Sequence, residues 1–122
     1  LNLYWNTGIP CTGRNLVNNT VMMERCYIAG SITNGDTVKS SEQREQAFAD
    51  AEYALELALF HPVNPMKLPH AHDKLWLSYM RECLTALLTC EAIYMLQGWE
   101  QSKGAKIEHK LAKQLGFKIF YQ

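Results

Sequence analysis

Residues 92–96 read Ala-Ile-Tyr-Met-Leu, a continuous apolar run of strand length. A strand that is apolar at every position is covered on both faces, as a central strand of a parallel sheet is. Gly98 follows the run almost at once and indicates that the strand ends there. This stretch therefore predicts the middle of a parallel sheet, with the rest of the chain arranged around it.

Strand-like and helix-like segments alternate on the amino-terminal side of this run. Residues 25–29 are a second short apolar run, which Gly30 stops. Residues 40–58 predict a helix, because a capping box stands at their start and apolar residues recur at helical spacing. Residues 59–65 predict a short strand, and their two prolines favour the edge of the sheet because each proline removes a hydrogen-bond donor.

The alternation continues on the carboxyl-terminal side. Residues 73–88 carry the apolar stripe of an amphipathic helix. Gly116 ends a last helix, and residues 117–121 predict a final strand. The last helix is predicted to bury a stripe made of Ile107, Leu111 and Leu115.

The order β-α-β-α-β-α-β predicts an α/β fold. We expect a three-layer, flavodoxin-like (Rossmann-like) parallel sheet of about four strands with helices on both faces. Ligands of such sheets bind beyond the carboxyl ends of the strands. The loops that follow Ala29 and Leu96 are therefore the candidate sites.

Composition narrows the class of protein. The 122 residues suffice for one domain with a sizeable core, and the 12 basic and 12 acidic residues cancel, which disfavours a nucleic-acid polymer as partner. No apolar run approaches the roughly 20 residues of a membrane span, no signal pattern is present, and the four cysteines form no Cys-x-x-Cys pair. We therefore expect a cytoplasmic protein with reduced cysteines and no membrane partner.

The first 21 residues contain glycine, proline and asparagine without a clear hydrophobic period. The chain starts at Leu1, and Met22 or Met23 offers a natural start. We therefore expect residues 1–21 to be an N-terminal extension that is not native, and the domain itself to span residues 22–122.

The loop after the central strand mixes small, aromatic and polar residues. It contains Gly98, Trp99, Ser102 and Gly104, and Glu108 lies one turn into the following helix. The helix start offers free backbone N–H groups and a positive dipole end, which favour an anion. Helical side chains lean toward the amino terminus, so Glu108 can point into the same crevice. A second interpretation stays open, in which Glu108 only complements the helix dipole.

Two motifs together carry a family resemblance. One is Tyr-Ile-Ala-Gly-Ser-Ile at residues 27–32, and the other is Ser102-x-Gly104-x-x-x-Glu108. The pair resembles the nucleoside 2-deoxyribosyltransferase superfamily over most of residues 25–121, and within it a group of small uncharacterised bacterial and phage domains (DUF4406-like). The resemblance implies N-glycosidic bond cleavage or deoxyribosyl transfer on a deoxynucleoside or its 5′-monophosphate, through a covalent glutamyl intermediate.

The resemblance also implies catalytic roles for individual residues. Glu108 would attack the anomeric carbon as the nucleophile, and Tyr27 occupies the matching tyrosine position. Glu82 and Glu91 stand where relatives often have aspartate. Glu82 would protonate or orient the leaving base, and Glu91 would contact the sugar. A second interpretation stays open, in which Glu82 is a solvated helix position and Glu91 a charge at a strand edge.

The substrate-binding residues come from both loops. Gly30, Ser31 and Ile32 would form one wall, in a loop that relatives acting on monophosphates use for phosphate. No arginine follows them, so a 5′-phosphate would rely on Ser31, Ser102 and the helix start beside Gly104. Phosphorylated and free nucleosides both stay open as ligands.

The remaining aromatic and histidine residues divide into core and loop. Trp76 falls on an apolar stripe and is expected in the core, whereas Trp99 is expected to wall the pocket and stack on a base. His70-x-His72 lacks a recognised ligand spacing, so we expect no metal and no cofactor.

A second functional hypothesis is a nucleotide-binding module that senses or sequesters a nucleotide-like ligand without chemistry. Retention of Tyr27, Ser102, Gly104 and Glu108 favours the enzyme, whereas the two longer acids and the missing arginine favour an altered function. The resemblance further implies a homo-oligomer, a dimer or higher.

Overall fold

The computed structural model of the chain describes residues 12–17, 20–32, 41–69 and 75–122. In chain order, its elements are β1 (Arg14–Val17), β2 (Thr20–Met23), β3 (Arg25–Ala29), α1 (Ser41–Leu57), β4 (His61–Val63), η1 (Pro65–Lys67), α2 (Trp76–Leu87), β5 (Ala92–Met95), η2 (Trp99–Gln101), α3 (Lys103–Gln114) and β6 (Lys118–Tyr121). Within these ranges, every helix falls short of the length and apolar character that a transmembrane span needs.

The strands β3 to β6 form one sheet in the order β4-β3-β5-β6, and every neighbouring pair is parallel. The predicted α/β fold with a four-stranded parallel sheet is thus confirmed. β5 is central and fully buried, and β4, which carries Pro62, lies at an edge, as predicted. The carboxyl ends of β3 and β5 lie side by side, since Leu96 N donates to Ala29 O at 2.8 Å.

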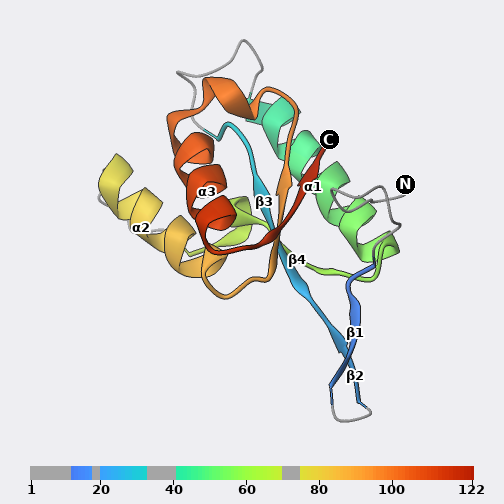
Figure 1. Cartoon of the computed structure of the whole chain (residues 1–122). Helices are drawn as coiled ribbons and strands as arrows, with labels where there is room; N and C mark the ends of the chain where they lie inside the picture. The colour runs from blue at the N-terminus through green and yellow to red at the C-terminus, as the bar shows by residue number, and fades with distance from the viewer. Residues whose placement is uncertain (1–11, 18–19, 33–40, 70–74) are drawn as a thin grey trace.

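Helix α1 covers one face of the sheet (Figure 1), and a cluster of hydrophobic residues is buried between them. Successive strand residues point to opposite faces, so Cys26 and Ile28 of β3 meet this helix. The predicted helical stripe is confirmed here, because Phe48 and Leu55 are buried. The core cluster consists of Cys26, Ile28, Phe48, Ala51, Leu55, Ala58, Phe60, Ala92, Tyr94, Leu96 and Phe120.

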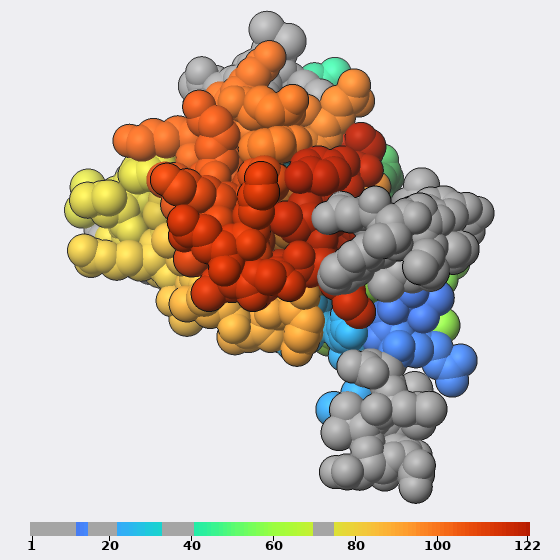
Figure 2. All heavy atoms as spheres, in the orientation of Figure 1, coloured from blue at the N-terminus to red at the C-terminus, as the bar shows by residue number. Residues whose placement is uncertain are grey.

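Helices α2 and α3 cover the opposite face of the sheet (Figure 1). The alternate β3 residues Tyr27 and Ala29 point toward them. In the space-filling view, α3 and β6 occupy the centre and α2 lies beside them (Figure 2). This second cluster consists of Tyr27, Ala29, Val63, Cys83, Leu87, Cys90, Ile93, Met95, Ala105 and Ala112.

Helix α3 turns a different stripe inward from the one predicted. Ile107 and Leu115 are 37% and 51% exposed, so their assignment to the buried stripe was wrong, although Leu111 does pack against the core. The buried residues of α3 are Ala105, Glu108 and Ala112. Small side chains let the helix approach the sheet closely, and the carboxyl group of Glu108 is carried inward with them.

A hairpin of β1 and β2 precedes the sheet and projects from the body (Figure 1). It falls largely within the segment for which no strand was predicted. Its root is fixed to the body, because Gly13 N donates to Ala58 O at 3.0 Å and Glu24 O accepts from His61 N at 2.9 Å. A Cβ atom at Gly13 would lie 2.4 Å from Leu59 O, so only glycine fits there.

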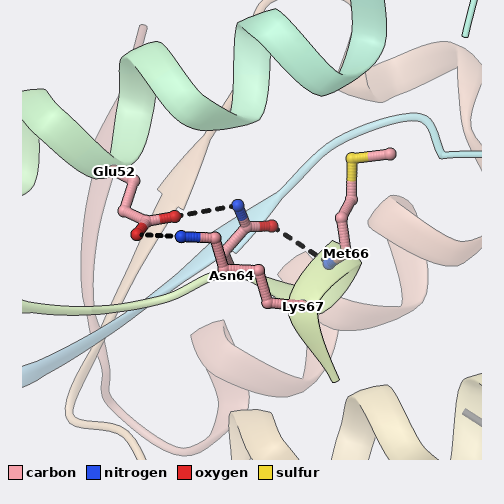
Figure 3. A network of polar contacts seen from close by, with 4 residues as sticks. All are labelled: Glu52, Asn64, Met66 and Lys67. Atoms are coloured by element: carbon pink, nitrogen blue, oxygen red, sulfur yellow. Dashed lines mark hydrogen bonds and ion pairs between the residues drawn. The ribbon is translucent and has the colours of Figure 1, made fainter. Parts of the chain in front are cut away.

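A polar network joins the turn after β4 to α1 (Figure 3). The amide of Asn64 donates to Glu52 and accepts from the backbone N–H of Met66, at 3.0 Å each. Lys67 Nζ lies 2.7 Å from the other oxygen of Glu52. The network holds the chain that leaves β4 against the helix on the α1 face, away from the face that carries Glu108.

Candidate active site

Glu108 is the one acidic side chain that the described part of the chain buries almost completely, with 4% of its surface exposed. It lies in the second turn of α3, whose other buried residues are Ala105 and Ala112. Tyr27, which is fully buried in β3, donates a hydrogen bond from its hydroxyl group to Glu108 Oε2. The two motifs that the sequence singled out therefore meet at one hydrogen bond.

Burial governs the protonation of this pair. It raises the pKa of Glu108 to about 8, and the hydrogen bond from Tyr27 opposes the rise. Burial also raises the pKa of Tyr27 well above its usual value, and the neighbouring Glu108 adds to this. Glu108 is thus largely protonated at pH 7, and Tyr27 keeps its proton throughout the ordinary pH range.

Ser102 and Gly104 build the start of α3 around Glu108. Ser102 is 3% exposed and is the N-cap residue, since its hydroxyl oxygen accepts from Ala105 N at 3.2 Å. Its hydroxyl group is therefore used to hold the helix start. Gly104 follows at a close approach, because a Cβ atom there would lie 3.0 Å from Met80 Sδ.

A narrow pocket opens onto Glu108 at the carboxyl ends of β3 and β5. Its volume is about 20 Å³, which leaves room for roughly one water molecule. Gly30, Ile32, Ser102, Gly104 and Glu108 all line it. The structure thus brings these five predicted site residues together.

Helix α2 supplies a wall that was not predicted. Trp76, Tyr79 and Met80 line the pocket, and Lys103 Nζ lies 4.5 Å from the ring centroid of Trp76 at its rim. A helix that precedes a parallel strand runs opposite to it, so its first turns lie at the carboxyl ends of the strands. That direction, with the i, i+3, i+4 spacing of the three residues, is the signal that could have identified them.

Trp76, which was expected in the core, lines the Glu108 pocket, and the base-stacking role of Trp99 stays a prediction. Trp99 lies against His109, with ring centroids 4.3 Å apart, and lines a separate pocket of about 320 Å³ beside Tyr121 and Gln122. It does not line the Glu108 pocket, whereas Trp76 does. His109 Nε2 and Tyr121 Oη lie 2.7 Å apart and complete this aromatic group.

Glu91 lies at the other end of the sheet from Glu108. It is exposed just before β5, and its Oε2 accepts from Arg25 N at 2.8 Å. The length of β5, roughly 13 Å for four residues, separates it from the pocket. Within the chain, Glu91 thus caps the amino-terminal edge of β3, and its sugar contact stays a prediction.

Glu82 and Ser31 lie near the pocket without lining it. Glu82 is half-buried in α2, and its charge contributes to raising the pKa values of Tyr79 and Cys83 after the larger effect of burial. Ser31 has a buried hydroxyl oxygen that makes no hydrogen bond to the described residues. The predicted base-protonating and phosphate-binding roles of these residues stay predictions.

The described residues contain no group of three or more histidine, cysteine, aspartate or glutamate side chains that could hold a metal ion. His70 and His72 lie outside the described ranges. Cys26, Cys83 and Cys90 are buried free thiols.

Comparison with known proteins places the chain by family. Neither the curated proteins nor the solved structures contain a match to it. One family model matches residues 24–121, which is most of the chain and includes all of the sheet, all three α-helices and the Glu108 pocket. The chain therefore belongs to the family described as a domain of unknown function, DUF4406.

Proposed function

We propose that the protein cleaves or transfers the N-glycosidic bond of a deoxynucleoside or deoxynucleoside 5′-monophosphate, with Glu108 as nucleophile. The main support is the buried carboxyl group of Glu108, which lines a pocket at the strand carboxyl ends and accepts a hydrogen bond from Tyr27. Burying a carboxyl group is costly, and such groups with shifted pKa values gather at functional sites. The type of reaction is inferred from the resemblance to nucleoside 2-deoxyribosyltransferases.

The reaction uses the ionised form of Glu108. A carboxylate oxygen forms a bond to the anomeric carbon, the bond from that carbon to the base nitrogen breaks, and the base leaves with the electron pair and takes up a proton. Water or a second base then attacks the glycosyl ester and releases the carboxylate. The Tyr27 hydroxyl group donates a hydrogen bond to Glu108 Oε2. Oε1 of Glu108 is then the oxygen that attacks.

The pKa of Glu108 predicts how this reaction responds to pH. With a pKa of about 8, the ionised fraction rises about tenfold for each pH unit below that value. Base release should therefore increase from pH 6 to about 8 and then level off. A rate that falls over this range would contradict an ionised nucleophile.

The test is base release from a panel of deoxynucleosides and their 5′-monophosphates, measured by chromatography. Wild type is compared with Glu108→Gln and with the matched control Glu100→Gln, an exposed acid in η2. We expect wild type and Glu100→Gln to release base, and Glu108→Gln to be slower by about 10³-fold or more. Release by Glu108→Gln at the wild-type rate would exclude Glu108 as nucleophile.

The second candidate is a nucleotide-binding module without chemistry. The lining of the pocket favours it, because Glu108 is the only acidic residue among the described residues that line this pocket. Calorimetry with the same panel separates the two functions. Binding without release of base from any compound supports the module, and release supports the enzyme.

Three further expectations concern the setting of the protein. We expect a homo-oligomer of two or more chains and a cytoplasmic location, with a small nucleoside or nucleotide as ligand. Light scattering on the purified protein measures the first of these directly.

A further inference from the structure

A second pocket shares no lining residue with the Glu108 pocket. This Trp99 pocket is lined by Met95, residues 97–101, Tyr121 and Gln122. It lies at the carboxyl ends of β5 and β6, where Met95 and Tyr121 are register partners, and ligands of parallel sheets bind beyond such ends. Its volume of about 320 Å³ lies in the range of small-molecule sites, whereas the Glu108 pocket holds about 20 Å³.

Two aromatic rings from different elements line the Trp99 pocket. Trp99 comes from η2 and Tyr121 from β6, and their ring centroids lie 6.3 Å apart. His109 of α3 contacts both of them. Its ring packs on Trp99 with centroids 4.3 Å apart, and its Nε2 lies 2.7 Å from Tyr121 Oη. The aromatic walls are therefore held in place before a ligand binds, which lowers the entropic cost of binding a flat ring against them.

The neutral polar side chains of the lining are amides. Gln122 Oε1 accepts from Gln97 N at 2.9 Å, which leaves the NH₂ group of Gln122 as a donor. Gln97 and Gln101 also line the pocket and carry side-chain amides. An amide presents donors and an acceptor side by side, as the hydrogen-bonding edge of a nucleobase does. The lining therefore matches a planar ring with a polar edge.

The charge of the lining disfavours a phosphate group. Glu100 is the single charged side chain among the described residues that line the Trp99 pocket. A phosphate bound there would face a carboxylate, with no lysine or arginine of the described lining to neutralise it. The pocket is therefore suited to a neutral ring compound.

We propose that the Trp99 pocket binds a nucleobase or a nucleoside without a phosphate, which stacks on Trp99 and forms hydrogen bonds with the glutamine amides. The inference goes beyond the proposed function, because no bond is made or broken in this pocket. The bound ring would lie against η2, which leads directly into Ser102, the N-cap of α3.

The experiment is calorimetry with adenine, adenosine and adenosine 5′-monophosphate as probes. We expect adenine and adenosine to bind to the wild type, and the monophosphate to bind about fivefold more weakly than adenosine. In Trp99→Ala the affinity for adenosine should fall by about tenfold or more, because stacking on the indole is lost. Trp76→Ala is the matched control, since Trp76 lines the Glu108 pocket instead. It should leave the affinity unchanged.

Two further measurements separate ligand contact from a structural role. Trp99→Phe keeps an aromatic wall and should keep most of the affinity for adenosine. Glu100→Gln removes the negative charge and should bring the affinity for the monophosphate close to that for adenosine. If Trp99→Ala fails to fold, nuclear magnetic resonance of the wild type gives the answer. On addition of adenosine, the amide signals of Gly98 and Gln101 should move more than that of Gly30, which lines the Glu108 pocket.

Three results would overturn the proposal. One is the absence of adenine and adenosine binding at millimolar concentrations. Another is a loss of affinity in Trp76→Ala as large as in Trp99→Ala, which would place the base in the Glu108 pocket or indicate a general loss of structure. The third is binding of the monophosphate to the wild type as tightly as adenosine.

Failure of this proposal can be told apart from failure of the proposed function. Calorimetry measures binding and needs no turnover. Adenosine binding that depends on Trp99, in a protein that releases no base, would keep the Trp99 site and exclude the enzyme. Base release that depends on Glu108, without adenosine binding that depends on Trp99, would do the reverse.

Discussion

The two faces of the sheet are built from the same strands and differ in what they bury. On the α1 face, Cys26 and Ile28 of β3 enter a cluster of hydrophobic residues, and α1 also buries Arg44. On the opposite face, the alternate residue Tyr27 donates a hydrogen bond to the buried carboxyl group of Glu108. The buried carboxyl group thus lies on the face that α2 and α3 cover, where it accepts a hydrogen bond. One face stabilises the fold, and the other supports the candidate chemistry.

The largest expected effect on stability is on the α1 face. Leu55→Ala removes a fully buried side chain from the α1 core and should lower the free energy of unfolding by about 2–5 kcal/mol. The titration of Glu108 should stay unchanged, because the sheet separates the two faces. Urea denaturation and titration of the Glu108 carboxyl group by nuclear magnetic resonance measure the two quantities. A shifted Glu108 titration would show that the faces are coupled.

Glu108→Gln tests the other face through pH. The folded protein holds a proton on Glu108 up to about pH 8, while the unfolded chain loses it near 4.5. The free energy of unfolding therefore falls as pH rises between these values, by at most about 1.4 kcal/mol for each pH unit. Glu108→Gln should abolish this slope and be more stable than wild type at pH 8. Denaturation at several pH values, with Glu100→Gln as control, checks it.

The smallest effect is expected at the amino-terminal edge. Glu91→Gln weakens an exposed hydrogen bond to Arg25 N and should cost about 0.5–1 kcal/mol. Base release should be unchanged, because the residue lies a strand length from the pocket. A loss of base release without a loss of stability would support the predicted role of Glu91 in the site.

Much of the fold was predictable because apolar runs of strand length recur with helical spacing between them. The hairpin was not predicted, although Leu16-Val17 and Val21-Met22 flank two asparagines, which are turn residues. The paired strands of the hairpin form an arm that lies outside the main core. Hydrophobic periodicity identifies helices and strands that pack one face on a core. The hairpin packs no face on the main core, so periodicity does not identify it.

The site was predictable only where the backbone dictates it. Tyr27 alternates with core residues in β3, and Glu108 follows a capped helix start, so both could be placed. The buried stripe of α3 was assigned wrongly because Ile107 and Leu115 are more hydrophobic than alanine. The residues that face the sheet are small, which lets the helix pack closely. Trp76 was expected in the core because it falls on an apolar stripe, but it lines the pocket. An apolar stripe does not tell which of its residues face the sheet and which face a pocket.

The root of the hairpin has a mechanical consequence. β2 runs into β3 through Glu24, whose carboxylate binds Lys118 of β6 at 2.7 and 2.9 Å. Gly13 O accepts from Glu24 N and locks the other strand of the hairpin to the same point. The hairpin is thus attached to the body at Glu24, the residue before β3. A force on the hairpin would act directly on β3, the strand that carries Tyr27.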